Sequence, residues 1–184
     1  PETVRNKVRP CVNSAIPPHP DSVRDLPLTE KFSRVYHDNI FRGAESRSGE
    51  GSDLLQTQVI RQAIPALVAE LGVKRFIDAP CGDWYWMRHT ALPVEQYIGL
   101  DIVGDMIAKH QQQFGREGVA FQVANLAETP LPAGDMIFSR DCLVHLSFAD
   151  TLKIIANFKR SGATYLLTTT FTEDRKSTRL NSSH

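Results

Sequence analysis

The sequence predicts an α/β fold in which helices flank a doubly wound, mostly parallel sheet. After Gly72, short apolar runs alternate with helical patterns, which is typical of βαβ units. Residues 74–86 predict a strand, a tight loop that Pro80 and Gly82 keep from continuing the strand, and an aromatic segment that starts a helix. Polar side chains follow successive strands, where open parallel sheets bind their ligands. A binding site is therefore expected at the carboxyl ends of the strands.

Five strands and three helices account for this pattern. The strands are expected at residues 74–79, 96–102, 119–124, 135–140 and 163–171. The helices are expected at residues 84–90, 104–114 and 148–160. Ser147 and Asp150 have the spacing of a capping box, which fixes the start of the last helix. Residues 125–134 contain two prolines and are expected to form no full helix.

The first 72 residues predict an arm followed by a helical lid. Residues 1–30 hold six prolines and predict an extended arm without chemistry. The lid segment, residues 31–72, is expected to contain a helix at 30–40, a flexible loop at 43–52 and a helix capped by Ser52 or Asp53. Pro65 predicts a kink or a split in that second helix. The loop either closes over a site or is a plain surface connection.

Residues 73–173 form the predicted core, and residues 174–184 do not fit it. These last eleven residues hold one apolar side chain and resemble a translated sequencing adapter. We therefore expect the natural sequence to stop near Glu173, which leaves the core incomplete at its C-terminus. A polar disordered tail is the alternative interpretation.

Composition and charge disfavour several functional classes. The chain has 184 residues, of which 41% are hydrophobic and 23% charged, as in a single globular domain. Lysine and arginine number 21, as do aspartate and glutamate, so no net field attracts nucleic acid or an anionic membrane. No apolar run approaches the roughly 20 residues of a membrane span. Three cysteines without CxxC spacing favour a reducing, cytoplasmic compartment over a disulfide framework or a zinc site.

The strand ends predict an adenosine ligand. Asp101 ends the second strand, 23 positions after Asp78, close to the interval at which a Rossmann-like unit presents a carboxylate to a ribose diol. Asn125 ends the third strand and can pair with an adenine edge, while Ile102 and Leu126 offer flat apolar contacts. The alternative for each acidic residue is a structural role as a helix cap.

The loop after the first strand favours a cationic cofactor over a dinucleotide. A dinucleotide loop needs GxGxxG, whereas this loop places Asp78, Pro80, Gly82 and Trp84 at the corresponding positions. Asp83 adds a negative charge that repels phosphate. S-adenosylmethionine carries a sulfonium and an ammonium, which suit Asp78 and Asp83 beside an aromatic run. That run is Trp84, Tyr85 and Trp86, and core packing is the alternative for each tryptophan.

Three segments resemble motifs of the class I S-adenosylmethionine-dependent methyltransferases. Residues 76–83, 97–102 and 138–147 resemble the first, second and fourth motifs in order and spacing, within a match over residues 73–171. The sequence departs from the family at Pro80 and Trp84, which replace the first and last glycines of the loop. No counterpart of the family's sixth and seventh strands precedes the suspect tail. More narrowly, residues 48–57 ahead of residues 78–83 are similar to a largely uncharacterised bacterial subgroup.

This resemblance implies a Rossmann-like class I methyltransferase fold and a set of cofactor contacts. It implies Asp78 and Gly82 near the methionine moiety, Asp101 at the ribose, and Asn125 with Leu126 at the adenine. The full set of predicted cofactor contacts is Asp78, Ala79, Pro80, Gly82, Asp83, Asp101, Ile102, Asn125, Leu126 and Arg140. No cluster of metal ligands appears in the sequence, so no metal is expected.

Residues after the fourth strand are the candidates for catalysis. Methyl transfer is an in-line displacement that depends largely on positioning, and a general base is optional. Asp141 and His145 are expected beside the place where the methyl group would point, and the ordinary pKa of a histidine side chain suits a proton acceptor at neutral pH. The alternatives are that His145 packs or caps the next turn and that Asp141 contacts the cofactor or the acceptor. Cys81 and Cys142 are interpreted as buried thiols rather than nucleophiles.

The sequence therefore predicts methyl transfer from S-adenosylmethionine to an unidentified acceptor, with a small molecule favoured and neither nucleic acid nor membrane expected. Three alternatives stay open. The chain is a methyltransferase-fold protein that binds without catalysis, or a nucleotide-dependent oxidoreductase, which Asp83 and the missing GxGxxG disfavour. The third alternative is an enzyme fragment that is inactive because an edge strand and its cover are absent.

Overall fold

Five parallel strands form a single sheet in the computed structural model, which describes residues 20–23 and 25–169. The strands are β1 (Arg75–Asp78), β2 (Gln96–Asp101), β3 (Val119–Val123), β4 (Met136–Ser139) and β5 (Tyr165–Thr168). Their order across the sheet is β3-β2-β1-β4-β5, so the direction of winding reverses between β1 and β4. The predicted doubly wound α/β fold is confirmed. Ligands bind at such a reversal point, beyond the carboxyl ends of the strands.

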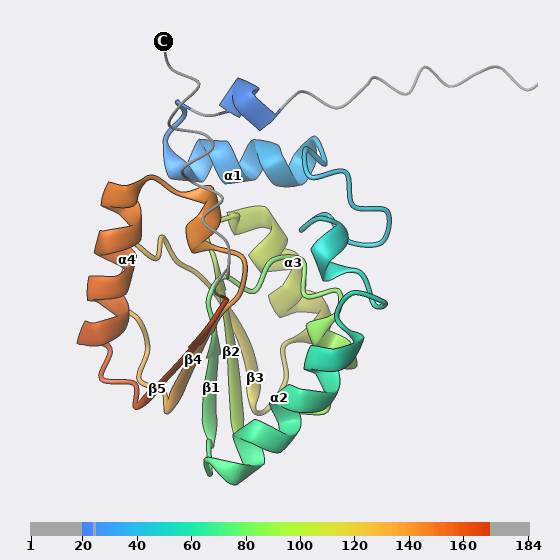
Figure 1. Ribbon diagram of the computed structural model, residues 1–184, viewed down its shortest axis with the longest axis vertical. Coiled ribbons are helices and arrows are strands. Elements are labelled where there is room, and N and C mark those ends of the chain that lie inside the picture. Colours follow the sequence, from blue (N-terminus) through green and yellow to red (C-terminus); the bar gives the residue numbers. More distant parts are fainter. Residues whose placement is uncertain (1–19, 24, 170–184) are drawn as a thin grey trace, which may run out of the picture.

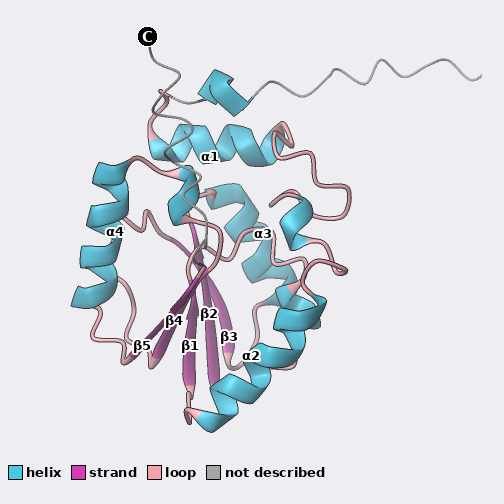
Figure 2. Cartoon of the chain, in the orientation of Figure 1, coloured by secondary structure: helices cyan, strands magenta, loops and turns pink. Residues whose placement is uncertain are grey.

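Helices cover both faces of the sheet, as Figures 1 and 2 show. The helices α2 (Gln58–Glu70) and α3 (Gly104–Phe114) lie on one face, and α4 (Phe148–Arg160) lies on the other. Side chains of β1 alternate between them: Phe76 packs with the α2 side and Ile77 with the α4 side. Both are fully buried, which explains why these strands appear in the sequence as continuous apolar runs.

The helix α1 (Leu28–His37) lies across the carboxyl ends of the strands (Figure 1). Two polar contacts hold it there. Lys31 Nζ donates to the carbonyl of His145 at 2.8 Å, and His37 Nε2 lies 3.2 Å from Asp105 Oδ1 on α3. Val35 is buried against Val23, so the end of the predicted arm packs on this helix. Residues 20–23 form a short 3-10 helix there, where an extended arm is predicted.

The predicted helix at residues 84–90 is wrong. The structure has turns there and only a 3-10 helix at Met87–His89. Trp84, Trp86 and Met87 are all buried. In a single α-helix, Trp86 would point away from the face that Trp84 and Met87 share, so the three side chains could not all reach one core. Trp84 also adopts φ +57, which breaks the helical path. Tertiary packing of these side chains overrides the local helical signal.

The predicted lid segment is corrected in three respects. Its second helix begins at Gln58, after a 3-10 helix at Glu50–Ser52, so neither Ser52 nor Asp53 caps it. Pro65 lies inside one continuous α2, so the predicted split is wrong; burial of Ile64 and Val68 stabilises the helix across the proline. Because α2 packs on the sheet, only α1 and the loop after it remain as a cover for the strand ends.

Three predictions fall wholly or partly on residues that the structure does not describe. They concern most of the N-terminal arm (residues 1–19), the last residues of the strand expected at 163–171, and the suspect tail at residues 174–184. Among the residues that are described, no helix is both long and apolar enough to cross a bilayer.

We predict that Gly99→Ala destabilises the sheet beside the site. A Cβ on Gly99 would lie 2.7 Å from Phe121 Cδ1 and 3.1 Å from Cys81 Sγ, both buried. Such overpacking costs about 1–3 kcal/mol of unfolding free energy, measurable by urea denaturation. Gly104→Ala is the control, because its Cβ would meet nothing nearer than 3.9 Å. Equal losses in both variants would contradict the prediction.

Candidate functional site

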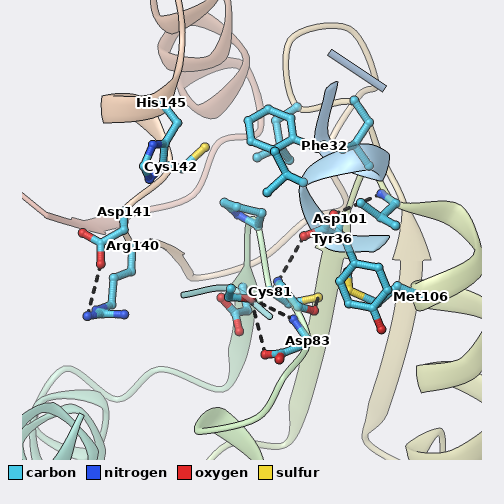
Figure 3. Close-up of a pocket in the computed structure, with 18 of the residues that line it drawn as sticks. Phe32, Tyr36, Cys81, Asp83, Asp101, Met106, Arg140, Asp141, Cys142 and His145 are labelled. Carbon is cyan, nitrogen blue, oxygen red and sulfur yellow. Dashed lines mark hydrogen bonds and ion pairs between the residues drawn. The ribbon is translucent and has the colours of Figure 1, made fainter. Parts of the chain in front are cut away.

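A cavity lies beneath α1, at the carboxyl ends of β1, β2 and β4. The loop after β3 also lines it. Figure 3 shows its two ends. Asp83, Asp101 and Cys81 gather at one end, and Arg140, Asp141 and His145 lie at the other. We call these the acidic end and the β4 end. The strand order predicts this position, because the reversal point lies between β1 and β4.

Asp101 joins the ends of β1 and β2. Its Oδ2 accepts from the backbone N–H of Gly82 and its Oδ1 from that of Val103, both at 3.0 Å. Burial raises the pKa of Asp101 to about 6, although the hydrogen bonds from Val103 and Gly82 oppose the shift. A carboxylate has lone pairs beyond these two bonds. Asp101 lines the cavity and can therefore also accept from ligand hydroxyls.

Asp78 lies at the end of β1 and is 3% exposed. Its Oδ2 accepts a hydrogen bond from the hydroxyl of Tyr97 on β2. Burial raises the pKa of Asp78 to about 7; the hydrogen bond from Tyr97 opposes the shift, and the nearby Asp101 adds to it. A cation bound beside this carboxyl group would favour its ionised form.

Gly82 has a conformation and surroundings that exclude a side chain. Its φ is +54, and a Cβ would lie 2.4 Å from Ser48 Oγ. Its carbonyl lies 3.1 Å from His110 Nε2 on α3. Burial lowers the pKa of His110, which favours the neutral ring at that contact. The sequence analysis missed His110, because nothing in the local sequence links it to a loop 28 residues earlier.

Asp83 binds the loop before α2 instead of standing free in the cavity. Its carboxylate accepts from Ser46 Oγ at 3.0 Å, from the N–H of Arg47 at 2.8 Å and from Ser48 Oγ at 3.3 Å. The Arg47 guanidinium in turn donates to the carbonyls of Tyr36 and His37, at the end of α1. Asp83 therefore fastens the cover of the cavity to the loop after β1.

Asn125 lines the cavity, but its carboxamide is bonded within its own loop. Its Oδ1 accepts from the N–H of Ala127 at 3.1 Å, and its Nδ2 donates to Glu128 at 3.0 Å. One N–H of the amide and one lone pair of its oxygen remain available for an adenine edge. Ile102 and Leu126 line the same end, as expected of apolar contacts.

The two residues after Asp78 differ in their relation to the cavity. Pro80 lines it, whereas Ala79 is fully buried in the core on the α4 side and is not a lining residue. The N–H of Ala79 donates to the carbonyl of Phe138 at 2.8 Å. Ala79 thus supports the loop from below, and a direct cofactor contact by its side chain is not supported.

Arg140 and Asp141 form an ion pair at the β4 end, with 3.1 Å between Nη2 and Oδ2. Arg140 Nη2 also donates to the carbonyl of Gly51 at 2.9 Å, and its guanidinium lies 5.7 Å from the Trp86 ring centre. Asp141 has φ +51, a conformation that costs a residue with a side chain about 1–3 kcal/mol. Non-glycine residues in such conformations cluster at functional sites.

His145 lies in a short 3-10 helix, Leu143–His145, that faces α1. Its ring lines the cavity, and its centre lies 4.8 Å from that of Phe41 with an interplanar angle of 31°. The predicted packing role and the predicted catalytic role are therefore both compatible with its position. The structure brings His145, Arg140 and Asp141 to one end of the cavity.

Comparison with known families decides the class. Residues 76–162 match the family model described as a methyltransferase domain. Residues 76–162 of the chain therefore correspond to a methyltransferase domain. That prediction is thereby confirmed, and the cofactor of this class is the cofactor predicted from the sequence. A search of the curated proteins finds no match.

Solved structures share the fold of this methyltransferase domain. The N-methyltransferase NodS from Bradyrhizobium japonicum WM9, in complex with S-adenosyl-L-homocysteine, has a TM-score of 0.54 and 11% identity, over 69% of this chain and 67% of that one. Magnesium protoporphyrin IX methyltransferase from Synechocystis PCC 6803, with bound S-adenosylhomocysteine, has a TM-score of 0.52 and 19% identity, over 70% and 65%. Human N-acetylserotonin methyltransferase, in complex with S-adenosylmethionine, has a TM-score of 0.54 and 16% identity, over 74% and 39%. The chain spans about two thirds of the first two proteins and less of the third.

The two described thiols of the methyltransferase domain, Cys81 and Cys142, are poorly suited to act as nucleophiles. Burial raises the pKa of Cys142 to about 12 and that of Cys81 well above its ordinary value, so both stay protonated at neutral pH. Trp84 packs among Tyr97, Phe114 and Phe121, which supports the core interpretation for that tryptophan. Across residues 20–23 and 25–169, no three metal-ligating side chains converge.

Asp78 gives the methyltransferase domain a predictable pH dependence. Its folded-state pKa, about 7, lies above the ordinary value of 3.8, so the folded protein holds this proton more tightly than the unfolded chain. Asp78 therefore stabilises the fold most below pH 4, and this contribution is lost as the pH rises to 7. Asn does not titrate, so Asp78→Asn should not lose this contribution. The unfolding free energy of the variant minus that of the wild type should therefore rise by up to about 1.4 kcal/mol per pH unit in that window. Urea denaturation from pH 4.5 to 7 measures the difference, and a constant difference would refute the assignment.

Asp83→Ala should loosen the loop at residues 46–48. The backbone amides of Arg47 and Tyr85 lose their acceptor, so their hydrogen exchange should accelerate by the equivalent of about 1–3 kcal/mol. Asp135→Ala is the matched control. Asp135 also accepts from two backbone N–H groups, but at the other end of β1. Unchanged exchange at Arg47 in Asp83→Ala would show that Asp83 does not hold the loop.

Proposed function

We propose that the chain binds S-adenosylmethionine in this cavity and transfers its methyl group to a small-molecule acceptor. One observation carries the proposal. The cavity lies at the reversal point of a methyltransferase fold, and the carboxyl groups of Asp78 and Asp101 end the neighbouring strands β1 and β2. Two buried acids beside one ligand are poorly solvated, so a cationic ligand with hydroxyl donors compensates both.

The described residues fit the parts of that cofactor. S-adenosylmethionine supplies an electrophilic methyl group on a sulfonium, together with an ammonium and a ribose diol. Asp101 accepts from the diol through the lone pairs that Gly82 and Val103 leave open. Asp78 faces the ammonium side, where ionisation of its carboxyl group strengthens binding. Ile102 and Leu126 contact the faces of the adenine ring.

A dinucleotide fits this site less well, because the loop offers no free backbone donors. Every N–H from Cys81 to Tyr85 already donates: to the carbonyls of Leu100 and Cys81, to the carboxylates of Asp101 and Asp83, and to Ser48 Oγ. A pyrophosphate needs such groups unpaired at the loop. The same residues support a cofactor whose charge is positive.

The residues of the β4 end are assigned to the acceptor. His145 accepts the proton of the acceptor, and the Asp141 carboxylate orients the acceptor's donor group, held in place by its ion pair with Arg140. Arg140 itself is bound to Gly51 and Asp141, which supports an indirect role rather than the predicted cofactor contact. A methyltransferase fold that binds without catalysis is the alternative, and it retains cofactor binding without product formation.

We further infer a cytoplasmic enzyme of the bacterial subgroup. Two unbridged thiols among the described residues support a reducing compartment. The segment at residues 48–52, which carries the subgroup resemblance, forms part of the cover of the cavity.

Calorimetric titration of S-adenosylmethionine and, separately, of NAD into the full chain tests the proposal. Binding of the first ligand alone is expected, and Asp101→Ala should weaken it by at least about tenfold, because a buried acceptor for two hydroxyls is lost. Glu95→Ala is the control, since Glu95 is exposed at the opposite end of the sheet. Retained thermal unfolding shows that each variant is folded. Binding of NAD in preference, or full binding by Asp101→Ala, would reject the proposed site.

A further inference from the structure

We propose that the methyl acceptor is an uncharged phenol, an inference that rests on the proposed function and specifies its substrate class. Three observations support it: the aromatic walls of the cavity, the bonds that already engage the charged groups around it, and the ring pair formed by Phe41 and His145. Each favours a flat and neutral molecule with an acidic hydroxyl group.

Aromatic side chains from four separate segments line the cavity. Phe32 comes from α1, Phe41 from the loop after it, Trp86 from the turns after β1 and Phe138 from β4. Trp86 and Phe138 are 7% and 5% exposed and meet edge to face, so they form a fixed floor. Such walls bind an apolar ring favourably through burial and ring contacts. A charged group placed between them would lose its solvation without compensation.

The guanidinium groups at the cavity are already bound within the protein. Arg140 is paired with Asp141, donates to the Gly51 carbonyl and lies over Trp86. Arg47 donates to the carbonyls of Tyr36 and His37. A carboxylate or phosphate on the acceptor would have to displace these contacts. The described arginines that line the cavity therefore hold its cover rather than receive an anion.

Charges at the acidic end also disfavour an ionic acceptor. Asp78, Asp83 and Asp101 line the cavity and repel an anion brought to the β4 end. A cationic acceptor is disfavoured for a different reason, because it would approach the positive sulfonium of the cofactor. Both signs of charge are thus excluded, and a neutral acceptor remains.

The Phe41 and His145 rings select an aromatic acceptor. Their ring centres lie 4.8 Å apart and their planes are tilted by 31°, and both line the cavity, so together they present an aromatic surface on which a further ring can pack. A phenol has a pKa of about 10, as tyrosine does, whereas water and simple alcohols lie near 16. An imidazole can therefore assist a phenol far more effectively.

The reaction balances with these groups alone. The acceptor O–H gives its proton to a ring nitrogen of His145, and an oxygen lone pair forms the bond to the methyl carbon. The bond from carbon to sulfur breaks, and its electron pair stays on sulfur. The products are an aryl methyl ether, S-adenosylhomocysteine and a protonated imidazole that returns its proton to water.

Four matched probes test the substrate class on the full chain with S-adenosylhomocysteine bound. They are 4-methylphenol, 4-hydroxyphenylacetate, tyramine and cyclohexanol. Calorimetry should show 4-methylphenol binding at least about tenfold more tightly than the other three, and mass spectrometry should show its methyl ether forming from S-adenosylmethionine. Equal or tighter binding of a charged or non-aromatic probe, or no binding of 4-methylphenol, would overturn the inference. Failure of S-adenosylhomocysteine itself to bind would reject the proposed function, and the inference with it.

Variants at Phe41 test the ring surface directly. Phe41→Leu keeps an apolar side chain but removes the ring, so 4-methylphenol affinity should fall about three- to tenfold while S-adenosylhomocysteine affinity stays unchanged. Phe41→Tyr should restore the affinity. Leu55→Ala is the control, since Leu55 is 78% exposed and does not line the cavity. Unchanged 4-methylphenol affinity in Phe41→Leu would overturn the stacking argument.

Discussion

The hydrogen bonds that Asp101 accepts from Gly82 and Val103 are the constraint from which the site is built. They fix the loop after β1 against the end of β2, next to the point between β1 and β4 where the winding of the sheet reverses. The same loop presents Asp83, whose carboxylate holds residues 46–48. Arg47 then binds the carbonyl end of α1. A continuous set of polar contacts therefore runs from the sheet to the cover of the cavity.

This arrangement reduces the stability of the empty fold. Asp78 and Asp101 are buried side by side, and burial raises the pKa of each. Near neutral pH, ionisation of these groups opposes folding, because the unfolded chain solvates the charged forms better. A positive ligand reverses the balance, since it favours the ionised carboxyl groups where the protein alone does not. The two acids thus lower the unfolding free energy of the empty protein at neutral pH, and the same burial favours a positively charged ligand.

Local sequence predicted the sheet well, because strands buried on both faces appear as short apolar runs. The same logic placed Asp78, Asp101 and Gly82 at strand ends that the structure brings together. It failed where distant contacts decide the conformation. Residues 84–90 follow the core instead of their helical pattern. The bonds from Asp83 to residues 46–48 and from His110 to Gly82 join segments that no local pattern connects.

The two ends of the cavity come from different parts of the chain, and this separates their tasks. The acidic end is made by the ends of β1 and β2, whose register allows little change. The β4 end is completed by Phe41, which belongs to the loop after α1 and packs on His145, while polar contacts of Lys31 and Arg47 hold this segment over the strand ends. Substitutions in that cover can alter the acceptor without disturbing Asp101. In the proposed function, the ends of β1 and β2 therefore hold the methyl donor, and the N-terminal segment contributes to the acceptor side of the cavity.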